Sequence, residues 1–126
     1  MPHVLVAEDS ADDLELFTMF LKMGGYSVTA VDTTDALLAA VYSSSPPDVL
    51  LLDLILDRAN GLEVVQTIRA DTRSASLPIV GITAATPRYV EAVAMKAGCD
   101  VFLTKPCQPA EVSQALHAAM LLRPSI

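Results

Sequence analysis

Asp53 ends the apolar part of the stretch DVLLLDLILD, where a carboxylate follows four apolar residues, Val49 to Leu52. Such a run predicts a strand that is buried on both faces, because it offers no polar side to water. A carboxylate at the end of that strand needs a cation, hydrogen bonds or water, since burying it unpaired costs several kcal/mol or raises its pKa until it is neutral. Asp53 is therefore the first candidate for a functional residue.

Four other residues that could take part in the same chemistry lie far from Asp53 in the sequence: Glu8, Asp9, Thr83 and Lys105. If the fold brings the three acids together, their like charges raise each other's pKa unless a cation intervenes. Mg²⁺ meets that need, because it prefers carboxylate, carbonyl and water oxygens and is often bound beside phosphate. Lys105 would add a positive charge for a phosphoryl oxygen, and Thr83 a neutral hydrogen-bond donor. The set indicates phosphoryl transfer, with Asp53 as the nucleophile that attacks phosphorus.

The elements that would position these residues alternate along the chain. Five short apolar runs predict strands at 3–7, 27–31, 48–52, 78–82 and 100–103, and segments of helical period predict helices at 11–24, 34–44, 61–72, 88–97 and 109–122. Strict alternation of strand and helix predicts right-handed crossovers. We therefore expect an α/β fold, with a five-stranded parallel sheet and five helices distributed over both faces.

In doubly wound sheets of this kind, ligands bind beyond the carboxyl ends of the strands. The candidate residues follow the predicted strands in this order: Glu8 and Asp9 the first, Asp53 the third, Thr83 and Ala84 the fourth, and Lys105 the fifth. We expect these side chains to converge on one edge of the sheet.

The length of 126 residues suits one domain, and the sequence shows no linker, repeat or low-complexity segment. We therefore expect residues 1–126 to form a single domain. Hydrophobic residues make up 52% of the chain, but no apolar run approaches the roughly 18 to 20 residues that are needed to cross a membrane.

The net charge and the N-terminal sequence indicate which classes of partner and which cellular compartment to expect. The chain has 8 Lys and Arg against 15 Asp and Glu, and a net charge of −7 repels nucleic acid and anionic membranes but favours cations. The start, MPHVLVAED, lacks the basic segment and long apolar run of a signal peptide, which predicts a cytoplasmic protein. Cys99 and Cys107 fit that compartment as reduced thiols, although a disulfide is left open.

Over essentially its whole length, the sequence resembles the receiver domain of two-component response regulators. The matching residues are the acidic pair Glu8-Asp9, Asp53, Thr83 in GITAA, and Phe102, Lys105 and Pro106 in GCDVFLTKP. Thr83 follows Asp53 by 83 − 53 = 30 residues and Lys105 follows it by 105 − 53 = 52, as in the family. The stretch NGLEVVQTIR is similar to the start of the family's third helix. The resemblance implies a flavodoxin-like doubly wound sheet with the strand order 2-1-3-4-5.

The resemblance also implies how the acids act. Asp53 would accept a phosphoryl group from a histidine kinase or a histidine phosphotransfer protein. The protein would thus catalyse its own phosphorylation as a switch, without being a turnover enzyme. Mg²⁺ would be bound by Asp9, Asp53 and the backbone carbonyl of Ile55, with Glu8 reaching the ion through water.

The remaining matched residues would bind the phosphoryl group or change conformation when it is present. Thr83, Ala84 and Lys105 would hold the phosphoryl oxygens, and Thr83 and Phe102 would form the switch. Lys105-Pro106 would be a cis peptide, which a tertiary amide tolerates at modest cost. Phosphorylation would change the binding of partners, which include a second copy of the chain or a downstream effector.

Some positions depart from the family's pattern. Asp57 stands where the loop after the acceptor usually has Pro; it adds a charge near the metal site, or is simply a solvated loop residue. Phe102 replaces the frequent Tyr and has no hydroxyl, so switching through it would work by packing. Ile55 and Ala85 are apolar at positions that in the family help to orient hydrolytic water. We therefore expect the acyl phosphate on Asp53 to hydrolyse slowly.

The predicted helix 11–24 carries two apolar stripes at helical spacing. Leu14, Phe17 and Leu21 form the stripe expected to face the sheet, and Leu16, Met19, Phe20 and Met23 form a second stripe at i, i+3, i+4, i+7 spacing. Either the second stripe docks onto a phosphodonor protein, or the predicted helix 109–122 covers part of it. The sequence leaves both interpretations open.

The same residues bear on three other functions. A receiver-like module that binds proteins without being phosphorylated is the main alternative; loss of an acid, Thr or Lys from the set would favour it, and all are present. A phosphatase with an aspartyl-phosphate intermediate would need a second carboxylate close to the nucleophile, and Asp57 is poorly placed for that. A flavodoxin-like cofactor binder would have a loop rich in Ser, Thr and Gly after the first strand, whereas this loop reads AEDSADD.

Overall fold

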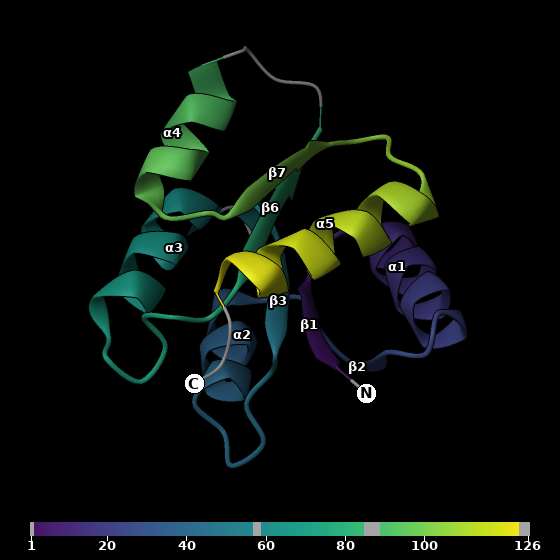
Figure 1. Cartoon of the computed structure of the whole chain (residues 1–126), viewed down its shortest axis with the longest axis horizontal. Coiled ribbons are helices and arrows are strands. Elements are labelled where there is room, and N and C mark those ends of the chain that lie inside the picture. Colours follow the sequence, from purple (N-terminus) through teal and green to yellow (C-terminus); the bar gives the residue numbers. More distant parts are fainter. Residues whose placement is uncertain (1, 57–58, 85–88, 124–126) are drawn as a thin grey trace.

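The computed structural model describes residues 2–56, 59–84 and 89–123, and its centre is a parallel sheet flanked by helices (Figure 1). The strands are β1 (His3–Ala7), β2 (Ser27–Val31), β3 (Val49–Asp53), β4 (Ile55–Leu56), β5 (Ala59–Asn60), β6 (Ile79–Thr83) and β7 (Val101–Thr104). The helices are α1 (Ala11–Met23), α2 (Thr34–Val41), α3 (Gly61–Ala70), α4 (Tyr89–Ala97) and α5 (Pro109–Leu122).

The five long strands run in the order β2-β1-β3-β6-β7, and all neighbouring pairs are parallel. Without the short β4–β5 hairpin, this is the expected order 2-1-3-4-5, so the predicted fold class is confirmed. β3 and β6 lie inside the sheet and are buried at all five positions. Their near-continuous apolar sequences suit strands that are covered on both faces.

Helices cover both faces of the sheet, as expected. α1 and α5 pack on one face, where Phe17 and Leu116 meet strand residues such as Leu51. α2, α3 and α4 pack on the other, where Leu37 and Ile68 belong to the core. Because successive side chains of a strand point to opposite faces, each strand contributes to both cores. Figure 1 shows α5 in front of the sheet with α1 beside it.

Three strands and three helices differ from the predicted bounds at their ends within the described residues, and one of them, α1, ends a residue early at Met23. β3, β6 and β7 each begin one residue later than predicted; Pro78, for example, has no N–H to donate to the ladder, and β6 begins at Ile79. α2 ends at Val41 instead of 44, where the Ser43 hydroxyl donates to the carbonyl of Ala40. α3 ends at Ala70 instead of 72, because Asp71 adopts an extended backbone. Local capping decides such ends more than periodicity does.

The β4–β5 hairpin was not predicted, and it folds the chain tightly back after Asp53. The N–H of Gly61 donates to the carbonyl of Leu54 over 2.8 Å. A Cβ at Gly61 would lie 2.6 Å from the Cα of Leu54, so only glycine allows this approach. Asn60 then caps α3 by accepting from the N–H of Leu62.

No helix in the described part of the chain combines the length and apolar character that a membrane span requires.

Candidate functional site

Three acids meet at the carboxyl ends of β1 and β3. Glu8, Asp9 and Asp53 each place one carboxylate oxygen within 4.8 Å of the others. Glu8 and Asp53 are 1% and 6% exposed, whereas Asp9 is exposed. The parallel pairing of β1 with β3 brings the ends of these strands together, as the sequence predicts.

Lys105 lies among the acids. It follows β7, and its Nζ donates to Glu8 Oε2 over 2.6 Å, to Asp53 Oδ2 over 2.9 Å and to Asp13 Oδ2 over 2.9 Å. The Lys105-Pro106 peptide is cis, as predicted. The structure therefore brings Lys105 together with two of the predicted acids and with one further acid, Asp13.

Backbone N–H groups hold the second oxygen of each buried acid. Asp53 Oδ1 accepts from the N–H of Ile55 over 2.8 Å, and Glu8 Oε1 accepts from the N–H of Ser10 over 3.1 Å. Each carboxylate is thus held between a backbone donor and the ammonium of Lys105. These hydrogen bonds fix the side-chain orientations at the sheet edge.

The electrostatics of the cluster are unbalanced. Burial raises the pKa of Glu8 from its ordinary value to about 7; the hydrogen bond from Lys105 opposes this shift, and Asp53 adds to it. Burial by itself lowers the pKa of Lys105, but its bonds to Glu8, Asp13 and Asp53 outweigh that effect and raise the pKa. Lys105 stays charged, while the acids compete for it.

The donor set and its charge fit a divalent cation. Glu8, Asp9 and Asp53 supply carboxylate oxygens, the ligands that Mg²⁺ prefers, within the reach of a single ion. Together with Asp13 they outnumber the ammonium of Lys105, so a divalent cation would relieve the remaining repulsion. Ile55, whose carbonyl was predicted as a ligand, begins β4 next to Asp53 and has a side chain that is 60% exposed.

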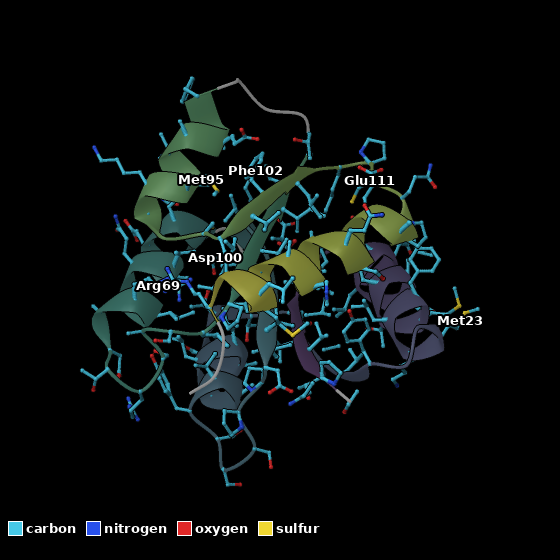
Figure 2. All side chains as sticks on the ribbon, viewed as in Figure 1. Met23, Arg69, Met95, Asp100, Phe102 and Glu111 are labelled. Atoms are coloured by element: carbon cyan, nitrogen blue, oxygen red, sulfur yellow. The ribbon has the colours of Figure 1, made fainter. Side chains whose placement is uncertain are left out.

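Thr83 and Phe102 lie on the other face of the sheet from the Lys105 cluster. By strand alternation, Thr83 shares a face with Ile79, which belongs to the core under α2, α3 and α4. Phe102 packs against the same core, and Figure 2 shows it on the side of β7 toward α4. The link between Thr83 and Lys105 is a backbone hydrogen bond from Lys105 N–H to the Thr83 carbonyl over 2.7 Å.

Some of the remaining predicted positions lie in the described part of the chain, and others lie outside it. Ala84 follows β6 and is exposed. Asp57 and Ala85, which departed from the family's pattern, lie outside the described residues. Asp13 was missed in the sequence, because an acid in the first turn of a helix is common there for its effect on the helix dipole alone.

The second apolar stripe of α1 is largely uncovered. Leu16, Met19 and Met23 are 42%, 49% and 80% exposed, and Phe20 is half-buried. Figure 2 shows Met23 pointing away from the body of the molecule. The stripe is therefore covered in part at Phe20 and open at the other three residues.

The stripe borders two hollows. Leu16 and Phe20 line a pocket of about 330 Å³ that also contains Lys105, Pro106 and Cys107. Met19 and Met23 line a groove of about 660 Å³ between α1 and β2, whose acidic side chains include Asp9, Glu15 and Asp32. Both hollows adjoin the acidic edge of the sheet.

Known proteins are similar to this chain over nearly its whole length. The family model for the response regulator receiver domain matches residues 4–117. The DNA-binding response regulator MtrA of Mycobacterium tuberculosis (strain ATCC 25618 / H37Rv) is 33% identical over 119 residues, which are 94% of this chain and 50% of MtrA. The DNA-binding dual master transcriptional regulator RpaA of Synechocystis is 32% identical over 121 residues, 95% of this chain and 49% of RpaA. The chain spans about half the length of these relatives.

Solved structures agree with the fold. A sensor protein from Polaromonas sp. JS666 superposes with a TM-score of 0.87 at 25% identity, over 97% of this chain and 98% of that protein. A CheY-like receiver domain protein from Methanospirillum hungatei JF-1 superposes with a TM-score of 0.86 at 18% identity, over 98% of this chain and 96% of that one. With the family model matching from β1 into α5, the chain belongs to the response regulator receiver domain family of two-component systems.

Proposed function

We propose that this receiver accepts a phosphoryl group on Asp53 from the phosphohistidine of a histidine kinase or a histidine phosphotransfer protein. The observation that carries the proposal is the contact of 2.9 Å between Asp53 Oδ2 and Lys105 Nζ, at the buried end of β3 and beside Glu8 and Asp9. A carboxylate, a fixed ammonium and an oxygen-rich cation site are the groups that phosphoryl transfer needs.

The transfer replaces one bond to phosphorus with another. A carboxylate oxygen of Asp53 forms a P–O bond while the P–N bond of the phosphohistidine breaks, and the leaving imidazole nitrogen keeps the electron pair. Lys105, the hydroxyl of Thr83 and the N–H of Ala84 would bind the phosphoryl oxygens. Because both oxygens of Asp53 are hydrogen-bonded, one of these bonds must open before attack.

Mg²⁺ is the cation that we propose for the acidic cluster. Asp9, Asp53 and the carbonyl of Ile55 would hold it directly, and Glu8 through water. When bound, the ion supplies positive charge to the acids and to the phosphoryl oxygens. The support is the donor set, three carboxylates that share one small volume.

The switch would join the two faces of the sheet. Thr83 and Phe102 share the face that carries α4, while Asp53 and Lys105 lie toward the face of α1 and α5. If Thr83 binds a phosphoryl oxygen, it moves toward the edge and leaves room beside Phe102. Phe102 has no hydroxyl, so its response would be a change of packing against α4. A second copy of the chain or a downstream effector would detect that change.

The exposed stripe of α1 is the surface that we propose for the phosphodonor protein. It borders the pocket that contains Lys105 and the groove that contains Asp9, so a helix seated there would bring its histidine close to Asp53.

We propose that phosphoryl transfer takes place in the cytoplasm and that residues 1–126 form a single receiver domain. The net charge of −7 makes direct binding of this domain to nucleic acid or membrane unfavourable; the DNA binding in the names of MtrA and RpaA describes those proteins.

Acetyl phosphate and Mg²⁺ provide the direct test. Intact-mass spectrometry should show the addition of one phosphoryl group to the wild-type protein and none to Asp53→Asn, which has an amide in place of the nucleophile. Asp48→Asn is the matched control, because Asp48 precedes the same strand at its opposite end and binds the backbone N–H of His3. Phosphorylation of Asp53→Asn, or a wild type that takes up no phosphate, would disprove the proposal.

A further inference from the structure

Asp13 contacts Lys105, although none of the roles proposed above includes it. Its Oδ2 lies 2.9 Å from Lys105 Nζ, the same distance as the Oδ2 of Asp53. The Asp13 side chain is 38% exposed, whereas those of Glu8 and Asp53 are 1% and 8% exposed. Asp13 therefore binds Lys105 from the solvent side of the cluster.

The start of α1 determines where Asp13 lies. Ser10 caps the helix: its hydroxyl accepts from the N–H of Asp13 and its carbonyl accepts from the N–H of Leu14. Phe17, four residues after Asp13, is buried and fixes the same face of α1 toward α5 and the sheet. Helical side chains lean toward the N-terminus, which here is the active edge. Asp12, its exposed neighbour, has no side-chain hydrogen bond or ion pair with any described residue.

The three N–H groups of Lys105 are all in use. They bind Glu8, Asp13 and Asp53, one carboxylate each, and an ammonium has three donors. During phosphorylation Lys105 must give up the oxygen of Asp53 for a phosphoryl oxygen. Glu8 and Asp53 also belong to the proposed metal site, so their charge is shared. Asp13 is outside that group of three acids, so a metal ion bound there would not compete with Lys105 for its carboxylate.

We propose that Asp13 is a positioning residue that keeps the ammonium of Lys105 at the phosphorylation site while Lys105 exchanges Asp53 for the phosphoryl group. The inference rests on the proposed function of Asp53 and adds a residue to it. A lysine has a flexible four-carbon stem, and a fixed anion at its end limits the positions that the ammonium samples. Without Asp13, Lys105 would spend more of its time away from the site.

Chemical labelling of lysines tests the position of Lys105 without any phosphoryl transfer. Brief acetylation with acetic anhydride, followed by peptide mass spectrometry, gives the labelling rate of Lys105 relative to Lys22 and Lys96, which are exposed. We expect Lys105 to be labelled several times faster in Asp13→Asn than in the wild type. Asp12→Asn, which removes the same charge from the same helical turn, should leave the rate unchanged, and Asp13→Glu should restore most of the protection.

The rate of phosphorylation by acetyl phosphate tests the consequence. Removing any acid near the site weakens its repulsion of an anionic donor, and Asp12→Asn measures that general effect. We expect Asp13→Asn to react about two to five times more slowly than Asp12→Asn, the scale of one partly exposed ion pair. Asp13→Glu should react at nearly the rate of the wild type. Urea unfolding of each variant shows whether it is folded under the assay conditions.

The outcomes separate this inference from the proposed function. Equal Lys105 labelling in Asp13→Asn and Asp12→Asn, or equal phosphorylation rates, overturns the role of Asp13 while leaving Asp53 as the acceptor. A wild type that gains no phosphate overturns both. Faster labelling together with slower phosphorylation in Asp13→Asn alone establishes the positioning role.

Discussion

At the scale of single residues, several acids of the site share the positive charge of one ammonium, that of Lys105. Lys105 is held by Glu8, Asp13 and Asp53, and two of these carboxylates are almost fully buried. Buried carboxylates that compete for one ammonium favour protonation or a further cation. The close packing of these acids therefore costs free energy unless their charge is neutralised.

This cost predicts a pH dependence of stability in buffer without divalent cations. The folded-state pKa of Glu8 is about 7 against an ordinary 4.5, because Glu8 is buried, so the folded protein binds this proton more tightly than the unfolded chain does. The stabilisation is complete below the unfolded value and is lost as pH rises through 7. We expect the free energy of unfolding, measured with urea, to fall by roughly 1 to 3 kcal/mol from pH 5 to 8.

Two comparisons check the assignment to Glu8. Glu8→Gln should remove most of the slope, because the amide does not titrate, whereas Glu91→Gln on exposed α4 should keep it. Addition of Mg²⁺ at pH 8 should recover stability by binding the folded protein. A wild-type slope that persists unchanged in Glu8→Gln would assign the effect to another group.

The side chains around Asp53 also predict a long-lived phosphoryl group. Ile55 begins the hairpin beside Asp53 and offers no polar group to orient water. The purified phosphoprotein, followed by intact mass after removal of the donor, should lose phosphate slowly. Ile55→Asn, which adds an amide next to Asp53, should lose it several times faster. Rapid loss from the wild type in the absence of a phosphatase would contradict this expectation.

At the scale of elements, α1 carries two features of the site. Its first turn places Asp13 at the active edge, while its body presents exposed Leu16, Met19 and Met23 beside the acids. An exposed apolar stripe rimmed by charged groups is typical of a surface that binds another protein. The helix thus joins an exposed apolar stripe directly to the Lys105 cluster.

Substitutions on α1 should separate docking from chemistry. Met19→Glu or Met23→Glu puts a charge on the stripe and should slow transfer from a phosphorylated partner protein about tenfold or more, on the scale of a lost apolar anchor. Phosphorylation by acetyl phosphate, which needs no docking, should stay within about twofold.

Leu121→Glu is the matched control, since Leu121 is an exposed apolar residue on α5. It should change neither rate. If Met19→Glu slowed transfer from the partner and from acetyl phosphate alike, the stripe would not be the docking surface.

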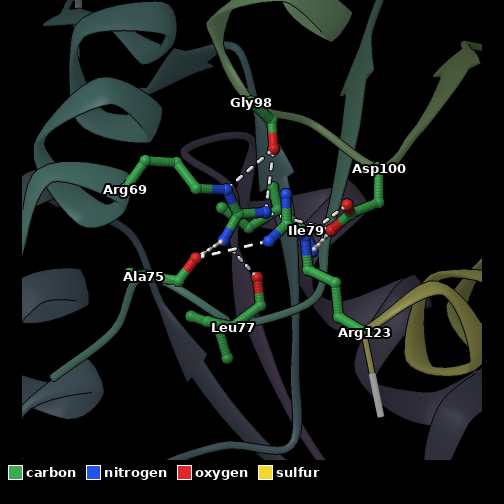
Figure 3. A network of polar contacts seen from close by, with 7 residues as sticks. All are labelled: Arg69, Ala75, Leu77, Ile79, Gly98, Asp100 and Arg123. Atoms are coloured by element: carbon green, nitrogen blue, oxygen red, sulfur yellow. Dashed lines mark hydrogen bonds and ion pairs between the residues drawn. The ribbon is translucent and has the colours of Figure 1, made fainter. Parts of the chain in front are cut away.

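At the scale of the whole molecule, a second polar network joins four segments at the opposite edge of the sheet (Figure 3). Asp100 accepts from Arg69 over 3.0 Å, from the N–H of Ile79 over 2.9 Å and from Arg123 over 2.5 Å. Arg69 also donates to the carbonyls of Ala75, Leu77 and Gly98. The network ties α3 and the end of α5 to the starts of β6 and β7, whose other ends carry Thr83 and Lys105.

Asp100→Ala should therefore destabilise the fold without changing the chemistry. The substitution leaves the N–H of Ile79 without its acceptor and removes the carboxylate that pairs with Arg69 and Arg123. We expect the free energy of unfolding to fall by roughly 2 to 4 kcal/mol. The phosphorylation rate of the folded variant should match that of the wild type. Asp71→Ala, which removes a surface ion pair with Arg73, should have little effect on either quantity. A loss of phosphorylation in folded Asp100→Ala would show that the two edges are coupled.

The sequence determined the architecture and the composition of the acidic edge. Alternating apolar runs and helical periods predicted the five long strands, their parallel pairing and the meeting of Glu8, Asp9, Asp53 and Lys105, because in a parallel sheet the carboxyl ends of all strands lie at one edge. Such arguments need only local patterns and one topological rule.

Only the tertiary structure decided which of these groups touch. It placed Thr83 and Phe102 on the opposite face from Lys105, added Asp13 to the Lys105 cluster and left most of the second stripe of α1 uncovered. It also formed the β4–β5 hairpin, which requires the close approach of Gly61 to Leu54. These features depend on side-chain direction and on packing between segments far apart in the chain. Periodicity reports the face that an element buries, but not the partner that each exposed or charged side chain finds there.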